Sequence, residues 1–404
     1  MEDRRSSFSG RFLAPYRRIT SSGKFIPEID GLRFIAIVSV YFYHLAGDVL
    51  RHSTAGEVRA LGGHWFFLVT QILNIGVPMF FVISGFILGL PFALARSRAG
   101  RPVPLGKYFL RRLTRLEPPY LLCLLLFFVL KIVAARGSAG MLLPHLLASC
   151  FYVHNLAYGV PSAINFVAWS LEIEIQFYIL APLLALLFAV SNAALRRSLL
   201  LGSLFAATGL SGLVSGNPQA QLSLLGYAQY FMAGFLLVEL HLSGALRRQG
   251  SWLWDLVALG AWPGLLALLV DGGMAAQWAS PWLILLLYVA AFRGRYVHGF
   301  VANAWIATIG GMCYSIYLVH NYVIAAMGAL TGHILPAGPF PSRVLLQFIL
   351  ITPVVLVISG LYFRFVERPC MVPDWPQRLA ARWTRVRFRW FLTLAPASEG
   401  SPDE

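Results

Sequence analysis

Residues 65–93 read WFFLVTQILNIGVPMFFVISGFILGLPFA, 29 consecutive positions without a charged side chain. A helix needs about 20 apolar residues to cross the hydrocarbon core of a bilayer, so this stretch is long enough to span it. The rest of the chain has the same character: 58% of its 404 residues are hydrophobic and only 12% are charged, against about 25% charged in soluble domains. The composition therefore predicts an integral membrane protein.

Further apolar runs of similar length occur along the whole chain. We therefore expect an all-α polytopic membrane protein with about ten transmembrane helices. The predicted spans lie near residues 32–50, 65–93, 116–135, 166–190, 198–215, 222–241, 252–270, 274–292, 300–328 and 344–365.

An eleventh segment, 141–157, is apolar but short, and it contains Pro144, His145 and His154. The distribution of basic residues indicates how it lies, because cytoplasmic loops of membrane proteins are enriched in Lys and Arg. If this segment does not span, 27 of the 32 basic residues fall on one side, whereas the bias collapses if it does. We predict that both termini are cytoplasmic and that 141–157 is a non-spanning segment, either re-entrant or at the outer face.

Three regions are expected along the chain. A basic cytoplasmic N-terminal tail occupies 1–27, a transmembrane domain occupies 28–368, and a basic, aromatic tail at the membrane surface occupies 369–404. The net charge of +15 does not indicate a nucleic-acid partner, because the basic residues cluster in loops between apolar runs. The four cysteines are scattered without a CxxC pair, so we expect neither a disulfide nor a metal site.

Ionisable side chains inside predicted spans are candidates for function, because charges are costly at membrane depth. His44 lies about 12 residues from the inner end of the first span, roughly 18 Å deep. Glu172 and Glu174 lie in the fourth span, about 10 Å from the outer surface, which is a similar depth. The two glutamates cannot share a helix face, so we expect one of them only to pair structurally. His320, near the outer end of the ninth span, adds a third polar element at this level.

Arg33 precedes His44 by 11 residues, which places both on one helical face, roughly 16 Å apart. This arrangement suits a long substrate with an anionic head that enters from the cytoplasm and presents its reactive end to His44. Taken alone, Arg33 would be interpreted as an anchor paired with Asp30.

A second group of arginines lies in RRLTRLEPPY, an inner loop before a span that opens at Pro118 and Pro119. The positive-inside rule alone would explain such a cluster. The sharper alternative is a phosphate clamp, because the planar guanidinium group matches phosphate oxygens. The residues concerned are Arg111, Arg112 and Arg115.

Five segments, occurring in the same order, resemble the acyltransferase-3 family of integral-membrane O-acyltransferases. The resemblance covers most of residues 28–366. It implies a fold of about ten helices that moves an acyl group from cytoplasmic acyl-CoA to an acceptor at the outer face. The matching segments are IDGLRFIAIVSVYFYH, GVPMFFVISGFILG, FLRRLTRLEPPY, VAWSLEIEIQFYILAPLL and CYSIYLVH.

The resemblance also implies roles for individual residues. His44 corresponds to the essential catalytic residue, and Arg33 to its partner on the same helix. Arg112 and Arg115 match the family's Arg-x-x-Arg motif, which implies donor binding. Some members carry a hydrolase-like extracellular domain after the last helix, which this chain is expected to lack.

The glutamates are the point at which this sequence departs from the family pattern. The glutamate that follows the family's Trp-Ser-Leu motif aligns with Glu174, but the next position, often acidic, is Ile175 here. Glu172 occupies a position that is usually small. Both Glu172 and Glu174 therefore stay as candidate catalytic residues.

These observations predict an O-acyltransferase of the bacterial cytoplasmic (inner) membrane, with no tightly bound cofactor and with acyl-CoA, acetyl-CoA in the first place, as co-substrate. The acceptor would be a cell-envelope polysaccharide or lipid-linked glycan, or else a small glycoside. In direct transfer, His44 would take the proton from the acceptor hydroxyl while Glu174 orients the imidazole or stabilises the imidazolium. In the alternative, His44 would carry the acyl group itself as an acyl-histidine. The sequence does not choose between the two, and it leaves the oligomeric state open.

Two other classes of protein compete with this prediction. A proton-coupled transporter could use His44, Glu172 and Glu174 as a relay, but the sequence contains no internal repeat. A glycosyltransferase that uses a polyprenyl-linked sugar would be expected to have larger loops outside the membrane. The acyltransferase prediction therefore leads.

Overall fold

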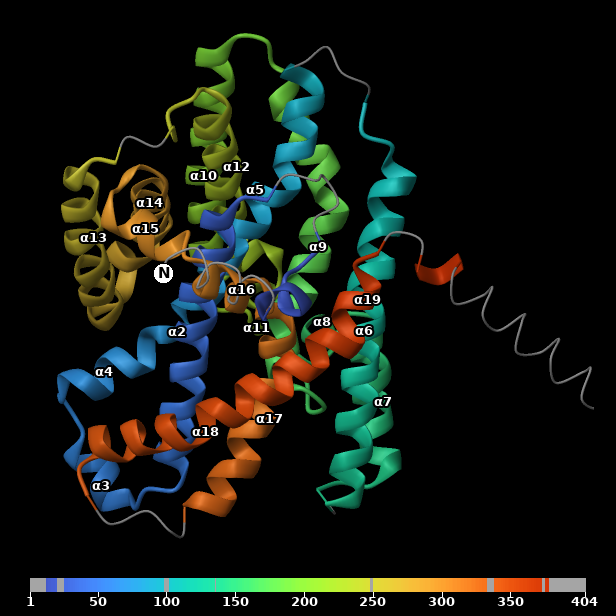
Figure 1. Ribbon diagram of the computed structural model, residues 1–404, viewed down its shortest axis with the longest axis vertical. Coiled ribbons are helices and arrows are strands. Elements are labelled where there is room, and N and C mark those ends of the chain that lie inside the picture. The colour runs from blue at the N-terminus through green and yellow to red at the C-terminus, as the bar shows by residue number, and fades with distance from the viewer. Residues whose placement is uncertain are drawn as a thin grey trace, which may run out of the picture.

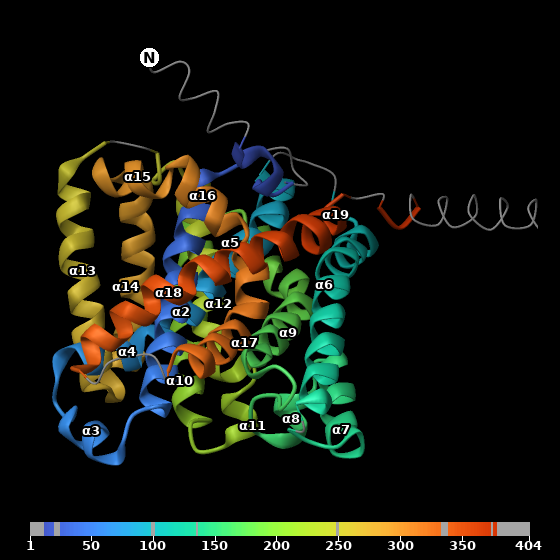
Figure 2. The same ribbon diagram turned by 60° about the horizontal axis from the view of Figure 1, so that its bottom comes forward.

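The computed structural model describes residues 12–19, 25–97, 102–134, 136–247, 250–332, 338–372 and 375–377. Within these ranges the regular structure is entirely helical, and most helices lie roughly parallel in one bundle (Figures 1 and 2). The fold class is therefore the predicted one, an all-α polytopic membrane protein. Much of the two predicted tails, residues 1–11, 20–24, 373–374 and 378–404, lies outside the described residues.

Nine helical stretches among the described residues are long and apolar enough to cross a membrane. Their main helices have the bounds α2 (Pro27–Arg51), α5 (Gly76–Ser97), α6 (Leu105–Val133), α9 (Trp169–Leu184), α12 (Leu224–Leu242), α13 (Trp252–Asp271), α14 (Gly273–Arg293), α17 (Cys313–Thr331) and α18 (Phe340–Tyr362).

The predicted span near 198–215 corresponds to α10 (Ala193–Leu213), which is 21 residues long. It is less apolar than the other nine because its first turn contains Arg196 and Arg197. α10 packs along α12 for most of its length and connects the end of the bundle where α9 finishes to the end where α12 begins (Figure 1). α10 therefore follows the course of the tenth span that the sequence predicted.

The segment predicted not to span forms α7 (Ala139–Cys150) and α8 (His154–Tyr158). α7 has 12 residues, so it is about 18 Å long and falls short of the roughly 30 Å hydrocarbon core. It packs against α6 at the end of the bundle where α6 finishes (Figure 2). The segment therefore enters and leaves on one side, as expected.

Two predicted spans are broken in the structure. The run 65–93 divides into α4 (Trp65–Ile72), a short 3-10 turn and α5. The run 300–328 divides into α15 (Tyr296–Val301), α16 (Ala304–Gly311) and α17. The break in the second run accompanies the close packing of α16 on α2: a Cβ atom on Gly310 would lie 1.8 Å from the Asp30 carbonyl oxygen, so only glycine permits this approach.

The two ends of the described chain meet on the side of the bundle where α2 begins (Figure 2). Arg368 Nε, in α19 (Arg368–Cys370), donates to the Arg17 carbonyl at 3.2 Å, next to η1 (Ala14–Tyr16). Trp375 Nε1 donates to the Thr114 carbonyl of α6 at 3.0 Å. Pro118 lacks the N–H that would reach this carbonyl within the helix, so the indole satisfies it from outside. The remaining short helices are α3 (Ala55–Ala60) and α11 (Pro218–Gln221).

The orientation of the bundle in the membrane is a testable prediction. We expect cysteines at Gly140→Cys and Gly216→Cys to react with a membrane-impermeant thiol reagent added to intact cells, because the few basic residues lie on that side. Pro102→Cys should react only after lysis. The unsubstituted chain, treated alike, gives the background from its native cysteines. External labelling of Ser191→Cys would contradict the predicted topology.

Candidate active site

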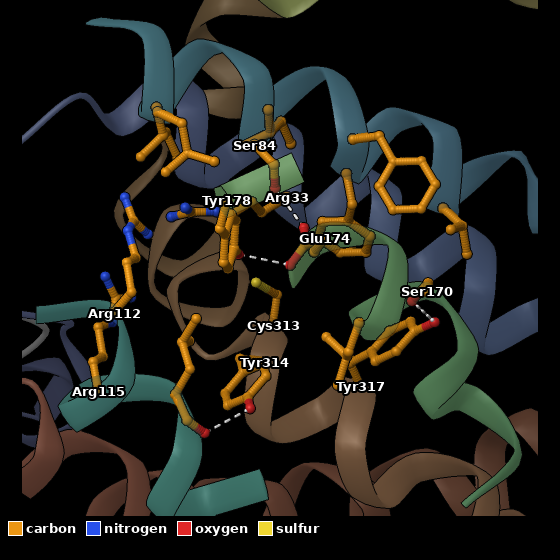
Figure 3. A pocket seen from close by; sticks show the side chains of 18 of the residues that line it. Arg33, Ser84, Arg112, Arg115, Ser170, Glu174, Tyr178, Cys313, Tyr314 and Tyr317 are labelled. Carbon is orange, nitrogen blue, oxygen red and sulfur yellow. Dashed lines mark hydrogen bonds between the residues drawn. The ribbon is translucent and has the colours of Figure 1, made fainter. Parts of the chain in front are cut away.

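A polar cavity lies between α2, α5, α6, α9 and α17, and it collects four of the residues singled out by the sequence (Figure 3). Three are arginines from different parts of the chain, and the fourth is a glutamate. The structure therefore assembles one cationic site from separate motifs. The four residues are Arg33, Arg112, Arg115 and Glu174, and the other polar side chains of this arginine cavity include Ser84, Ser170, Tyr178, Cys313, Tyr314, Tyr317 and Glu367.

The position of the Arg-x-x-Arg pair differs from the predicted inner loop. α6 begins at Leu105 and continues through the two prolines, so the arginines occupy its first turns. Arg112 and Arg115, three residues apart, share the face toward the cavity, whereas Arg111 is exposed outside it. Arg112 lies over the Tyr178 ring at 5.4 Å. The buried Nε atom of Arg115 has no hydrogen-bond partner among the residues that the structure describes. That unpaired donor is free to bind a ligand.

Arg33 combines the two roles that the sequence left open. It pairs with Asp30, Nη1 to Oδ1 at 2.5 Å, and it also lines the cavity. The other oxygen of Asp30 accepts from Arg18 Nε at 2.9 Å. Burial, with the neighbouring guanidinium of Arg33, lowers the pKa of Arg18 to about 9. One carboxylate thus serves two cations at the edge of the cavity, which leaves this region attractive to an anion.

Glu174 faces this cavity and does not contact His44. Its carboxylate accepts hydrogen bonds from Ser84 Oγ and from Tyr178 Oη, the latter at 2.8 Å (Figure 3). No hydrogen bond joins Glu174 to His44 among the described residues. The contacts therefore associate Glu174 with the arginines and give no support to its expected role in orienting the imidazole.

Glu172 points to a different neighbour. This agrees with the expectation that the two glutamates cannot share a helix face. Its buried carboxylate accepts from the backbone N–H of Asn155 at 2.8 Å. The Asn155 side chain donates in turn to the carbonyls of Trp169 and Leu222. These bonds fix α8 against α9. Glu172 is thus the structurally paired member of the two, and no hydrogen bond connects it with His44 in the described part of the chain.

His44 lies further along α2, next to His320 of α17. The two ring centroids are 5.0 Å apart, and the Phe166 ring packs edge-on to His44 at 6.1 Å. His320 is fully buried, and its Nδ1 atom lies 3.0 Å and 2.9 Å from the carbonyl oxygens of Ile316 and Tyr317. The structure therefore places the third polar element predicted at this depth directly beside His44.

A tyrosine and a serine separate this histidine pair from the arginine cavity. Tyr317 Oη and Ser170 Oγ are hydrogen-bonded at 2.6 Å, and both residues line the cavity (Figure 3). The ring of Tyr317 is 5.9 Å from that of His320. The end of the cavity that Tyr317 and Ser170 line is thus separated from the histidine pair by a single side chain.

Two residues in or near the cavity, Glu367 and Arg18, were not singled out from the sequence. Glu367 lies in a π-helical turn, Phe363–Glu367, after α18, and it accepts from Ser315 N–H at 3.1 Å and Ser315 Oγ at 2.5 Å. Arg18 lies in the segment predicted to be a tail. An acidic residue directly after the last span could have drawn attention to Glu367, but nothing in the sequence connects Arg18 with Asp30.

Known proteins resemble this chain over most of its transmembrane region. The sequence profile of the acyltransferase-3 family, described as an acyltransferase domain, matches residues 26–364. Peptidoglycan O-acetyltransferase OatA of Listeria monocytogenes is 30% identical over 194 residues, covering 45% of this chain and 28% of that protein. O-acetyltransferase OatA of Staphylococcus aureus is 25% identical over 382 residues, covering 86% and 57%. The chain thus spans little more than half the length of the longer-matching relative, and no solved structure matches it.

Proposed function

Since this chain belongs to the acyltransferase-3 family, we propose that it is a membrane O-acetyltransferase that takes its acyl group from acyl-CoA on the cytoplasmic side. The observation that carries the proposal is the arrangement on α2. Arg33 lies in the arginine cavity. His44 lies about 16 Å along the same helix, beside the end of that cavity that Tyr317 and Ser170 line. Acyl-CoA has a charged head and a long arm that ends in the thioester, which suits these two ends.

The donor's phosphate groups would bind to Arg33, Arg112 and Arg115. Guanidinium groups hold phosphate oxygens through charge-assisted hydrogen bonds, and one such donor, Arg115 Nε, is already unpaired. Glu174 and Glu367 border the same space and would keep the arginines in position before the donor binds. The thioester would then approach Tyr317 and the histidine pair.

In the proposed reaction His44 acts as the general base. It takes the proton of an acceptor hydroxyl as the oxygen attacks the thioester carbonyl. The carbon–sulfur bond breaks, and the leaving thiolate of coenzyme A receives the proton from His44. The products are an ester on the acceptor and free coenzyme A, so no further reactant is needed.

The acceptor is proposed to be a cell-envelope glycan reached from the outer face of the bacterial inner membrane. The names of the similar proteins support this class: one is a peptidoglycan O-acetyltransferase and another an O-acetyltransferase. The transporter alternative gains no support from the contacts, because Glu172 is engaged with α8 and Glu174 with Ser84 and Tyr178.

The proposal is tested by incubating purified protein in lipid vesicles with radiolabelled acetyl-CoA and isolated peptidoglycan fragments. We expect label to pass to the glycan as a base-labile ester, with release of one coenzyme A for each ester formed. Vesicles without protein give the uncatalysed background. Binding of acetyl-CoA without label in any glycan would remove the acceptor proposal, and no consumption of acetyl-CoA would remove the donor.

A further inference from the structure

We propose that His320 is the positioning residue of His44, accepting a hydrogen bond from its imidazole through Nε2. This inference rests on the proposed function, because it assumes that His44 acts as the base. It assigns to a second histidine the orienting role for which the sequence suggested Glu174.

The tautomer of His320 follows from its two backbone contacts. A carbonyl oxygen can only accept a hydrogen bond, so a ring nitrogen that lies 2.9 Å and 3.0 Å from two such oxygens must carry the proton. That nitrogen is Nδ1. A neutral imidazole has one N–H, so Nε2 carries a lone pair, and it points away from the backbone of its own helix.

This lone pair is unsatisfied in the described structure. The side chain of His320 is fully buried, and its Nε2 atom has no hydrogen-bond partner. A buried acceptor without a partner costs about 1–3 kcal/mol, so such an atom calls for an explanation. The ring of His44, 5.0 Å away between centroids, can offer it an N–H.

The other groups around His44 are aromatic rings or are already engaged with other side chains. Phe166 and the neighbouring Tyr43 present aromatic rings to the imidazole. Asp48, one turn further along α2, is paired with Arg51 at 2.8 Å and lies 3.5 Å from His52. The free acceptor at His44, among the residues that the structure describes, is therefore Nε2 of His320.

The chemistry gives this contact a purpose. An N–H of His44 that is held by His320 fixes the tautomer in which the other ring nitrogen is bare and can take the proton of the acceptor hydroxyl. When that proton arrives, the imidazolium keeps its hydrogen bond to His320. The same proton then passes to the coenzyme A thiolate, and His320 itself gains and loses nothing.

The test compares three variants of His320 in the purified protein. His320→Phe keeps the ring but removes the acceptor, so kcat should fall about 10- to 100-fold, as expected when a reacting group is misplaced. His320→Gln places its Oε1 where Nε2 was and should keep most of the wild-type kcat. The shorter side chain of His320→Asn can reach only the Nδ1 position, where its amide NH₂ group would donate to the two carbonyls, so it offers no acceptor at the Nε2 position and should resemble His320→Phe. The affinity for coenzyme A should be unchanged in all three, because the donor's head binds elsewhere.

The control is His145→Phe, the same chemical change at a histidine of α7 that bonds His154 at 2.8 Å, and it should leave kcat unchanged. Wild-type kcat in His320→Phe would overturn the inference, and so would a His320→Gln variant as slow as His320→Asn. If His320→Phe does not fold, the comparison of Gln with Asn still decides. A wild-type protein without acyl transfer would defeat the proposed function instead, so the two failures are distinguishable.

Discussion

Replacing His44 with alanine should abolish acyl transfer, while the protein should still insert and still bind coenzyme A. A general base contributes about 10²–10⁴-fold to a rate, so at least this factor should be lost from kcat. Donor affinity should stay at the wild-type value because Arg33, Arg112 and Arg115 lie in the cavity rather than beside His44. The measurement is turnover of acetyl-CoA by purified protein, with coenzyme A affinity determined on the same preparation.

The matched control for this experiment is His52→Ala. His52 belongs to the end of the same helix, where it is half-exposed and bonds to the Asp48 backbone at 2.9 Å, so its loss should leave turnover close to wild type. Substantial residual turnover in His44→Ala would remove His44 from the role of base. Normal turnover together with an acylated enzyme in wild type would favour the acyl-histidine route over direct transfer.

Removing the Arg-x-x-Arg pair should weaken donor binding more than any other change in the cavity. Each charge-assisted contact to phosphate is worth about 1.5–3 kcal/mol, so Arg112→Ala and Arg115→Ala should each lower affinity on the order of tenfold to a hundredfold. Lysine at either position should restore only part of this, because it lacks the planar fork. Titration of coenzyme A against purified protein measures the effect.

Arg111→Ala is the control that the helix itself provides. It lies on the same turns of α6 but is exposed outside the cavity, so it removes the same charge without a cavity contact. Unchanged affinity in the Arg112→Ala/Arg115→Ala double variant would refute the phosphate clamp. Equal losses in Arg111→Ala would show that only the general charge of the inner face matters. Absence of coenzyme A binding to the wild-type protein would return the transporter to consideration.

The sequence predicted the crossings well because length and apolar composition are properties of each segment alone. It also predicted that 141–157 does not span, since the distribution of Lys and Arg depends on how many crossings precede each loop. The breaks before α5 and α17 were not predicted. An apolar run has the same composition whether it is one helix or two, and the break at Gly311 depends on how closely α16 approaches α2.

The site was predicted in part, and the omissions have a physical cause. The position of Arg33 on the same helical face as His44 follows from helical spacing. The proximity of Arg112 and Arg115 follows from a recognisable motif. The direction of Glu174 does not follow, because a helix that is apolar on nearly all sides carries no pattern that fixes its rotation. Contacts between distant segments, such as Arg18 with Asp30, depend on where loops return and leave no local trace.

Side chains from both extremes of the chain close the arginine cavity. Arg33 belongs to the first membrane helix, and Glu367 follows the last one. A ribosome therefore delivers the three arginines to the bilayer long before it synthesises Glu367. During that interval the side of the cavity that Glu367 forms is still missing from the nascent chain. The cavity is complete only after nearly the whole transmembrane domain has been translated and inserted.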